Sequence, residues 1–134
     1  MKPCVFCRIV SGELPSRKIY EDEECLVFMD IAGDVDAHLV AIPKTHCKSL
    51  LDCPRESLRA LMDGVQRVSR HLTQHCGYDG VNLLHASEES AGQSVPHLHV
   101  HLIPRRAGDG LDTWPKLPGS RLDADRLHKE LTML

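Results

Sequence analysis

Three histidines, His97, His99 and His101, alternate with apolar residues late in the chain. An imidazole can attack phosphorus, bind a metal ion or move a proton. Because successive side chains of a β-strand point to opposite faces, Leu98 and Val100 are expected to enter the core while the histidines share the other face. Such a row can place one imidazole on a substrate and its neighbour on a metal ion or a second oxygen.

Two kinds of metal site are compatible with these residues. Cys4-Val5-Phe6-Cys7 is a C-x-x-C pair, which fits either a zinc knuckle or a redox pair. A thioredoxin-like pair follows a strand and starts a long helix, so the position of this pair near residue 1 favours metal. The alternative places all three histidines on one catalytic zinc ion. That alternative leaves the C-x-x-C unexplained and lacks the additional acidic ligands or base of metal hydrolases.

The run from Gly92 to Pro104, Gly-Gln-Ser-Val-Pro-His-Leu-His-Val-His-Leu-Ile-Pro, resembles the histidine triad (HIT) family of nucleotide-binding hydrolases and transferases. The resemblance is to the zinc-containing, bacterial-type branch and extends from about Cys4 to Arg106. It implies a structural zinc site with four ligands: Cys4, Cys7, His46 in Pro-Lys-Thr-His, and His97. A closed tetrahedral site of this kind has no open position and does not activate water.

The resemblance also implies the chemistry of a covalent nucleotidyl-histidine. His99 is expected to attack the α-phosphate, and His101 and Ser94 are expected to stabilise phosphoryl charge and to supply a proton to the leaving group. Asp30 is the implied ribose-binding acid. The implied nucleotide-binding set is Asp30, Phe28, Ile31, Gly92, Gln93, Ser94, His99 and His101. The expected function is hydrolysis or transfer at the α-phosphate of a purine nucleotide, with a phosphoramidate or a dinucleoside polyphosphate as substrate.

One departure from the family pattern lies before the triad. Family members carry an asparagine, often followed two residues later by a glycine, at positions that align with Ala86 and Glu88. The asparagine contacts phosphate in the family, and alanine cannot do so. His85 or Ser87 is a candidate substitute. The departure also keeps open a second function, a nucleotide-binding adaptor with weak or no catalysis.

Length and charge limit the number of domains and the classes of protein that the chain can belong to. The chain has 134 residues, with 16 basic and 19 acidic side chains and a net charge of −3. We expect a single domain, 1–134, with its core at about 4–106 and a tail at 107–134. A net acidic chain lacks the basic field that nucleic acid requires. The sequence contains no membrane-length apolar run or signal-peptide core, so a cytoplasmic protein without disulfides is expected.

The hydrophobic pattern predicts an α+β, HIT-like fold with an antiparallel sheet of about five strands, one long helix and a C-terminal helix. Strands are expected at 19–20, 25–29, 38–42 and 81–85 and at the triad. The long helix is expected over 52–77, with Asp52 as its N-cap, Gly77 as a left-handed C-terminal residue and Gly64 packed closely on the sheet. The resemblance further implies a homodimer.

Overall fold

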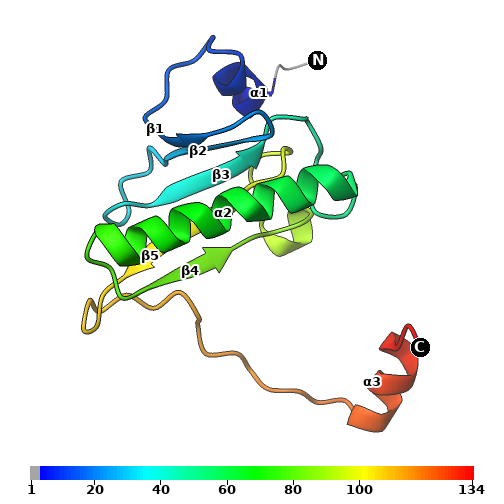
Figure 1. Ribbon diagram of the computed structural model, residues 1–134. Coiled ribbons are helices and arrows are strands. Elements are labelled where there is room, and N and C mark those ends of the chain that lie inside the picture. The colour runs from blue at the N-terminus through cyan, green and yellow to red at the C-terminus, as the bar shows by residue number, and fades with distance from the viewer. Residues whose placement is uncertain (1–3) are drawn as a thin grey trace.

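The computed structural model describes residues 4–134 and contains a five-stranded antiparallel sheet with a helix on each face (Figure 1). The strand order is β1-β2-β3-β5-β4. In chain order the elements are α1 (Val5–Val10), β1 (Lys18–Glu21), β2 (Cys25–Met29), β3 (Leu39–Pro43), α2 (Arg55–His75), β4 (Gly80–Leu84), the 3-10 helix η1 (Glu89–Ala91), β5 (Val100–Arg105) and α3 (Ala124–Leu131). The predicted α+β fold, with an antiparallel sheet of five strands, one long helix and a C-terminal helix, is confirmed. Residues 1–3 of the predicted domain lie outside the described residues.

Helix α2 covers one face of the sheet and forms the larger of two apolar clusters (Figure 1). Its residues at three- and four-residue spacing form a single buried stripe, as expected for an amphipathic helix. The stripe packs on alternate residues of the strands. The cluster includes Leu61, Val65, Val68 and Leu72 of the helix and Cys25, Val27, Leu39, Ala41, Leu98, Val100 and Leu102 of the sheet and its approach.

The opposite face carries the triad and is covered in part by α1. Leu26, Phe28, Val40 and Ile42 form a second buried cluster on this face, and Phe6, Ile9 and Val10 of α1 pack against it. The predicted alternation is therefore correct, because the apolar residues of the triad segment pack toward α2. Strand β5 begins only at Val100, so His97 and His99 lie in the extended approach to the strand. The amide of Leu98 donates to the carbonyl of Cys47 at 2.8 Å instead of to a neighbouring strand.

The predicted start of the long helix was wrong. Helix α2 begins at Arg55 with Pro54 as its N-cap residue, and no side chain caps it. The carboxylate of Asp52 instead accepts the backbone N–H groups of Ser49 at 2.8 Å and Lys48 at 3.1 Å, in the turn before the helix. The predicted left-handed residue after the helix is confirmed, since Gly77 has φ of +79°.

Gly64 lies where α2 packs against Cys25 of β2. A Cβ atom on Gly64 would lie 2.5 Å from Sγ of Cys25, whose side chain is fully buried. Gly64→Ala is therefore expected to lower the free energy of unfolding by about 1–3 kcal/mol through overpacking, although alanine is the better helix former. Urea denaturation measures this change.

A matched control is Gly80→Ala, because a Cβ atom at Gly80 would have no heavy atom within 4 Å. The control is expected to change the free energy of unfolding by less than about 1 kcal/mol. A Gly64→Ala protein as stable as the wild type would contradict the close approach of α2 to the sheet.

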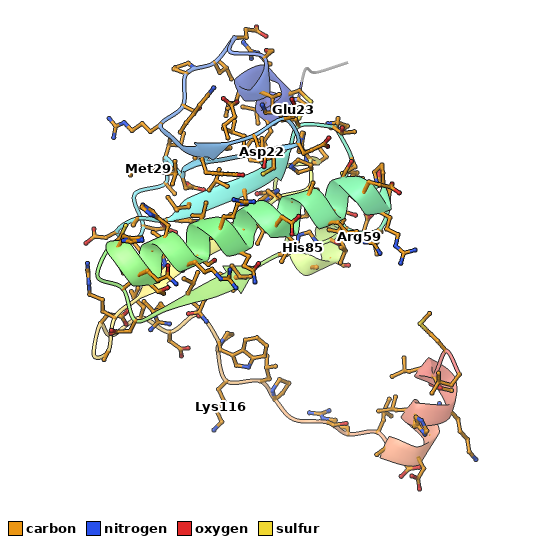
Figure 2. The ribbon with its side chains drawn as sticks, viewed as in Figure 1. Asp22, Glu23, Met29, Arg59, His85 and Lys116 are labelled. Carbon is orange, nitrogen blue, oxygen red and sulfur yellow. The ribbon has the colours of Figure 1, made fainter. Side chains whose placement is uncertain are left out.

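The tail after the sheet leaves the body of the molecule. An extended segment that contains Lys116 leads to α3, which lies apart from the sheet (Figure 2). No residue of α3 is buried. Among residues 4–134, none of the helices combines the length and the apolar character needed to cross a membrane.

Candidate functional site

Four side chains that the sequence assigned to zinc lie together at the end of the sheet beside α1. Cys4 is the N-cap of α1 and Cys7 lies in its first turn. His46 follows β3, and the fully buried His97 approaches β5. The potential ligand atoms of these four residues all lie within 4.8 Å of one another. Chain segments far apart in the sequence thus form one Cys₂His₂ cluster.

The spacing of the cluster matches the edges of a zinc tetrahedron. Sγ of Cys4 lies 3.3 Å from Nδ1 of His97, and Sγ of Cys7 lies 3.3 Å from Nδ1 of His46 and 3.6 Å from Nδ1 of His97. The two imidazole nitrogens are 3.1 Å apart. Zn–S and Zn–N bonds of about 2.3 and 2.05 Å place ligand atoms about 3.3–3.8 Å apart around a tetrahedron. These donors therefore fit zinc in both chemistry and spacing.

His97 connects this cluster to the rest of the triad. Its Nε2–H donates to the carbonyl of Pro43 at 2.9 Å, which leaves the lone pair of Nδ1 directed at the cluster. The carbonyl of His97 accepts Nδ1–H of His99 at 2.8 Å. One residue thus fixes a ligand nitrogen through its side chain and the neighbouring imidazole through its backbone.

His99 is held as a nucleophile requires. Because its Nδ1 donates to a carbonyl, the lone pair of the neutral ring is on Nε2. The side chain is 6% exposed, and the edge of the Phe6 ring packs against it with ring centroids 5.3 Å apart. The centroid of the His101 ring lies 5.0 Å from the centroid of the His99 ring. Packing and one hydrogen bond together fix the orientation of this ring.

His38 is a site residue that the sequence analysis missed. Its Nε2 lies 2.8 Å from Nδ1 of His101, and its Nδ1 lies 2.8 Å from Oδ1 of Asp34. Burial, together with the neighbouring His99 and His38, lowers the pKa of His101. A carboxylate–imidazole–imidazole chain thus ends at the third histidine of the triad. No short-range pattern marks His38, because its contact with His101 depends on the pairing of β3 with β5.

A cavity of about 950 Å³ opens in front of the triad. This volume lies in the range typical of small-molecule sites. Phe28, Asp30, Ile31, Ser94, His99 and His101 line it, and these are six of the eight residues expected to bind nucleotide. Asp30 stands where β2 ends, with Oδ1 accepting the N–H of Ala32 at 2.7 Å, so Oδ2 remains directed at the cavity side.

The other two expected nucleotide-binding residues, Gly92 and Gln93, do not line this cavity. Gly92 takes the left-handed conformation that ends η1, with φ of +90°. The amide group of Gln93 accepts N–H of Glu88 at 2.9 Å and donates to the carbonyls of Lys48 at 2.6 Å and Val95 at 2.9 Å. Both residues shape the loop that presents Ser94.

The segment that departs from the family pattern has its own hydrogen bonds. His85 donates from Nδ1 to the carbonyl of His99 at 3.0 Å, and its Nε2 lies 2.6 Å from Oγ of Ser87. This side-chain contact lies just beyond the last paired residues of β4 and β5, Leu84 and His101. The imidazole of His85 therefore anchors the backbone of His99.

Glu88 holds a backbone conformation that favours glycine, with φ of +77° and ψ of 160°. This region costs a non-glycine residue on the order of 1–3 kcal/mol. Glu88→Gly is expected to raise the free energy of unfolding by about 1 kcal/mol, because the strain relieved exceeds the value of the exposed Lys48–Glu88 ion pair. Thermal or urea unfolding measures the change.

Glu88→Ala is the matched control for this prediction, because it removes the same ion pair but keeps a Cβ atom at the strained position. It is expected to be no more stable than the wild type. Equal stability of the glycine and alanine variants would show that the conformation carries no strain.

Three cations at the loops that flank the sheet have partners outside the cavity, whereas Arg17 lines the cavity. Arg105 donates to Asp109 at 2.8 Å and to Asn82 at 2.7 Å, and the Arg106 guanidinium stacks 4.1 Å from the centroid of the Tyr78 ring. Lys48 pairs with Glu88 at 3.0 Å. These side chains serve the loops that flank the sheet.

Comparisons with known proteins agree with this geometry. The HIT domain profile matches residues 11–108. Protein hit of Bacillus subtilis is 40% identical over 108 residues, which span 80% of this chain and 74% of that protein. Adenosine 5'-monophosphoramidase HNT1 of Saccharomyces cerevisiae is 35% identical over 130 residues, 96% of this chain and 80% of that protein.

A solved structure adds a relative with zinc. The Zn-bound histidine triad family protein from Mycobacterium smegmatis superposes with a TM-score of 0.77 at 40% identity, covering 82% of this chain and 80% of that chain. The triad, the sheet and these matches lead to the same assignment. The chain belongs to the histidine triad (HIT) family.

Proposed function

We propose that this protein hydrolyses or transfers a purine nucleotide at its α-phosphate, through a covalent nucleotidyl-histidine on His99. The observation that carries the proposal is the fixed His99 ring, whose Nε2 lone pair is free while the side chain lines a nucleotide-sized cavity. Asp30 lines the same cavity and offers a carboxylate oxygen to ribose hydroxyls. The phosphoramidase name of the yeast relative supports this reaction class.

The proposed reaction has two displacements at phosphorus. In the first, Nε2 of His99 forms a bond to the α-phosphorus as the bond to the leaving group breaks, and Ser94 passes a proton to the departing atom. The resulting phosphorylated ring is cationic, and its Nδ1–H keeps its bond to the carbonyl of His97. In the second, water attacks phosphorus as the bond to Nε2 breaks, the proton that water loses returns to Ser94, and release of the nucleotide restores the neutral imidazole. His101 stabilises the phosphoryl oxygens in both steps.

A phosphoramidate is the favoured substrate. A polyphosphate leaving group carries several negative charges and calls for cations beyond the α-phosphate. Arg105, Arg106 and Lys48 are instead engaged by Asp109, Tyr78 and Glu88. Of the Lys and Arg side chains in the described residues only Arg17 lines the cavity, where Asp30 and Asp36 also lie. An amine leaving group needs only a proton. This distribution of charge supports cleavage of a P–N bond over a P–O–P bond.

The test is turnover of an adenosine phosphoramidate and a diadenosine polyphosphate side by side by the wild-type protein. Release of AMP is expected from both, with the higher kcat/KM for the phosphoramidate. Absence of AMP release from either, although AMP binds, would overturn the catalytic proposal. Ala86 favours the second candidate function in that case, a nucleotide-binding adaptor, because it lacks the amide that contacts phosphate in the family.

We further propose that the Cys₂His₂ cluster holds one structural zinc ion. Cys4, Cys7, His46 and His97 supply two thiolates and two imidazoles, which neutralise the ion and complete its coordination. When bound, zinc supplies a cross-link between α1 and the triad segment, and its lack of an open position keeps it out of the reaction. The zinc of the mycobacterial relative supports this choice of metal.

A homodimer in the cytoplasm completes the proposal. The tail exposes apolar side chains that this single chain does not cover, with Trp114 76% and Leu131 73% exposed. None of the six cysteines forms a disulfide in the described residues, which fits a reducing compartment. Light scattering after gel filtration tests the dimer, and a monomer at micromolar concentration would contradict it.

His85 is expected to position His99 for this reaction. His85→Ala removes the donor to the His99 carbonyl and is expected to lower kcat about tenfold while KM stays within about threefold. His85→Asn is expected to restore most of the rate, because its amide nitrogen occupies nearly the place of Nδ1. Steady-state kinetics of the two variants checks both results, and equal rates for alanine and asparagine would contradict the positioning role.

A further inference from the structure

Three potential metal-ligand atoms converge on one point at the edge of the cavity, away from the Cys₂His₂ cluster. They are Oδ2 of Asp30, Nε2 of His38 and Nδ1 of His101, and all lie within 4.8 Å of one another. Nε2 of His38 is 2.8 Å from Nδ1 of His101 and 3.7 Å from Oδ2 of Asp30. The three side chains come from the end of β2, the residue before β3 and the interior of β5.

Neighbouring groups determine where the protons of this cluster lie. Asp34 accepts Nδ1–H of His38 at 2.8 Å, so Nε2 of neutral His38 carries a lone pair. The N–H of Ala32 occupies Oδ1 of Asp30 and leaves Oδ2 as an acceptor. When His101 is neutral, its Nδ1 carries at most one proton, and this is the only proton among the three atoms. Removal of that proton leaves three lone pairs directed at one point, which a small cation can bind.

We propose that Asp30, His38 and His101 form a second, weaker site for a divalent transition-metal ion such as Zn²⁺, which replaces the shared proton and excludes nucleotide. Two imidazoles and one carboxylate on one side of an ion, with open positions opposite, are a common set for such metals. Ligand atoms about 2.0–2.2 Å from zinc lie about 3.3–3.5 Å apart. The observed separations of 2.8 and 3.7 Å require shifts of only a few tenths of an ångström.

One ligand of the second site is held by a hydrogen bond to a neighbouring carboxylate, as is common in metal sites. The bond from His38 to Asp34 is a carboxylate–histidine pair, which fixes the ring and raises the basicity of its ligating nitrogen. Imidazole ligands favour Zn²⁺, Ni²⁺ or Co²⁺ over Mg²⁺ and Ca²⁺, which prefer oxygen ligands. The site shares no residue with the Cys₂His₂ cluster, and its open positions face the cavity that Asp30 and His101 line.

The consequence for nucleotide rests on the proposed function. An ion on Asp30 and His101 occupies the groups proposed to bind ribose and to stabilise phosphoryl oxygens. Metal and nucleotide then compete, and free Zn²⁺ reversibly inhibits the protein. Metal binding itself does not depend on catalysis and is measured without substrate.

The experiment is calorimetric titration of the zinc-loaded protein with ZnCl₂, with MgCl₂ as the comparison. Wild type is expected to bind about one further Zn²⁺ per chain and no Mg²⁺. Asp30→Asn and His38→Gln are expected to weaken this step beyond detection, and Asp34→Asn to weaken it about 10- to 100-fold through His38. Asp36→Asn is the matched control, because Asp36 lines the same cavity but lies outside the cluster, and it is expected to bind as wild type does.

Saturating AMP is expected to raise the apparent Kd of the second Zn²⁺. The site is overturned if wild type binds no further ion, or if the Asp30 and His38 variants bind it unchanged while circular dichroism shows them folded. Its placement is overturned if AMP binds without weakening Zn²⁺ binding. A protein that binds the second Zn²⁺ but not AMP supports the metal site and counts against the proposed function.

Discussion

His99→Ala is expected to lower the rate of AMP release by on the order of 10⁴-fold, because it removes the atom that forms the covalent bond to phosphorus. Nucleotide affinity is expected to stay within about tenfold, since Asp30, Phe28 and Ile31 still line the cavity. Single-turnover kinetics measures the rate. Mass spectrometry of wild type quenched with denaturant at alkaline pH, where the P–N bond of the intermediate survives, is expected to detect a nucleotidylated chain, and the variant to lack it.

The control for this prediction is His128→Ala, which removes a histidine of α3, outside the site. It is expected to keep wild-type turnover. A His99→Ala protein with an unchanged rate would refute the nucleophile assignment. Loss of AMP binding together with loss of rate would point instead to a collapsed cavity, which circular dichroism separates from a chemical defect.

Cys7→Ser is expected to remove the structural zinc and to destabilise the fold by several kcal/mol. Zinc bound by small Cys/His peptides contributes about 10–16 kcal/mol of apparent binding free energy at pH 7. A variant without zinc is expected to lose part of a comparable contribution to its folding free energy. Phe6 is expected to lose its packing contacts with the rings of His97 and His99, because α1 is then no longer cross-linked to the triad segment. Metal analysis checks the loss of zinc, and thermal unfolding checks the loss of stability.

Protein purified without added metal is expected to carry about one zinc per wild-type chain and close to none in Cys4→Ser or Cys7→Ser. Cys76→Ser is the control, since this cysteine is exposed and lies outside the cluster. Full zinc occupancy in both cluster variants would refute the structural zinc site.

The triad was predictable because β5 lies inside the sheet and its two faces differ. Strands β3 and β4 pair with its two edges, one face packs on α2, and His101 on the other face lines the cavity. This difference between the faces produces the alternation that is visible in the sequence. Cys4 and Cys7 were recognisable as a metal pair from their C-x-x-C spacing, but their partners His46 and His97 could be named only through the family resemblance. Spacing in the sequence does not bring Cys4 to His97, which is 93 residues away.

Other features depended on strand register or on a choice between hydrogen-bond partners, and the sequence reveals neither. His38 meets His101 across 63 residues, so only the register of β3 on β5 identifies it. Asp52 had the residue type of an N-cap, but the turn before the helix offered its carboxylate two closer N–H groups. Gln93 lies in the expected loop, yet the amide group that seemed available for nucleotide satisfies the backbone of that loop.

The contact between Cys4 and His97 also has a consequence for synthesis of the chain. The 92 residues between them include all of β1 to β4 and α2, so the metal cluster cannot close until most of the domain has been made. During translation the two thiols are exposed to oxidants and to competing metals while their imidazole partners are still absent. Slow loop closure over this distance makes metal capture a late event in folding. We expect newly made protein to be most sensitive to oxidation in that interval.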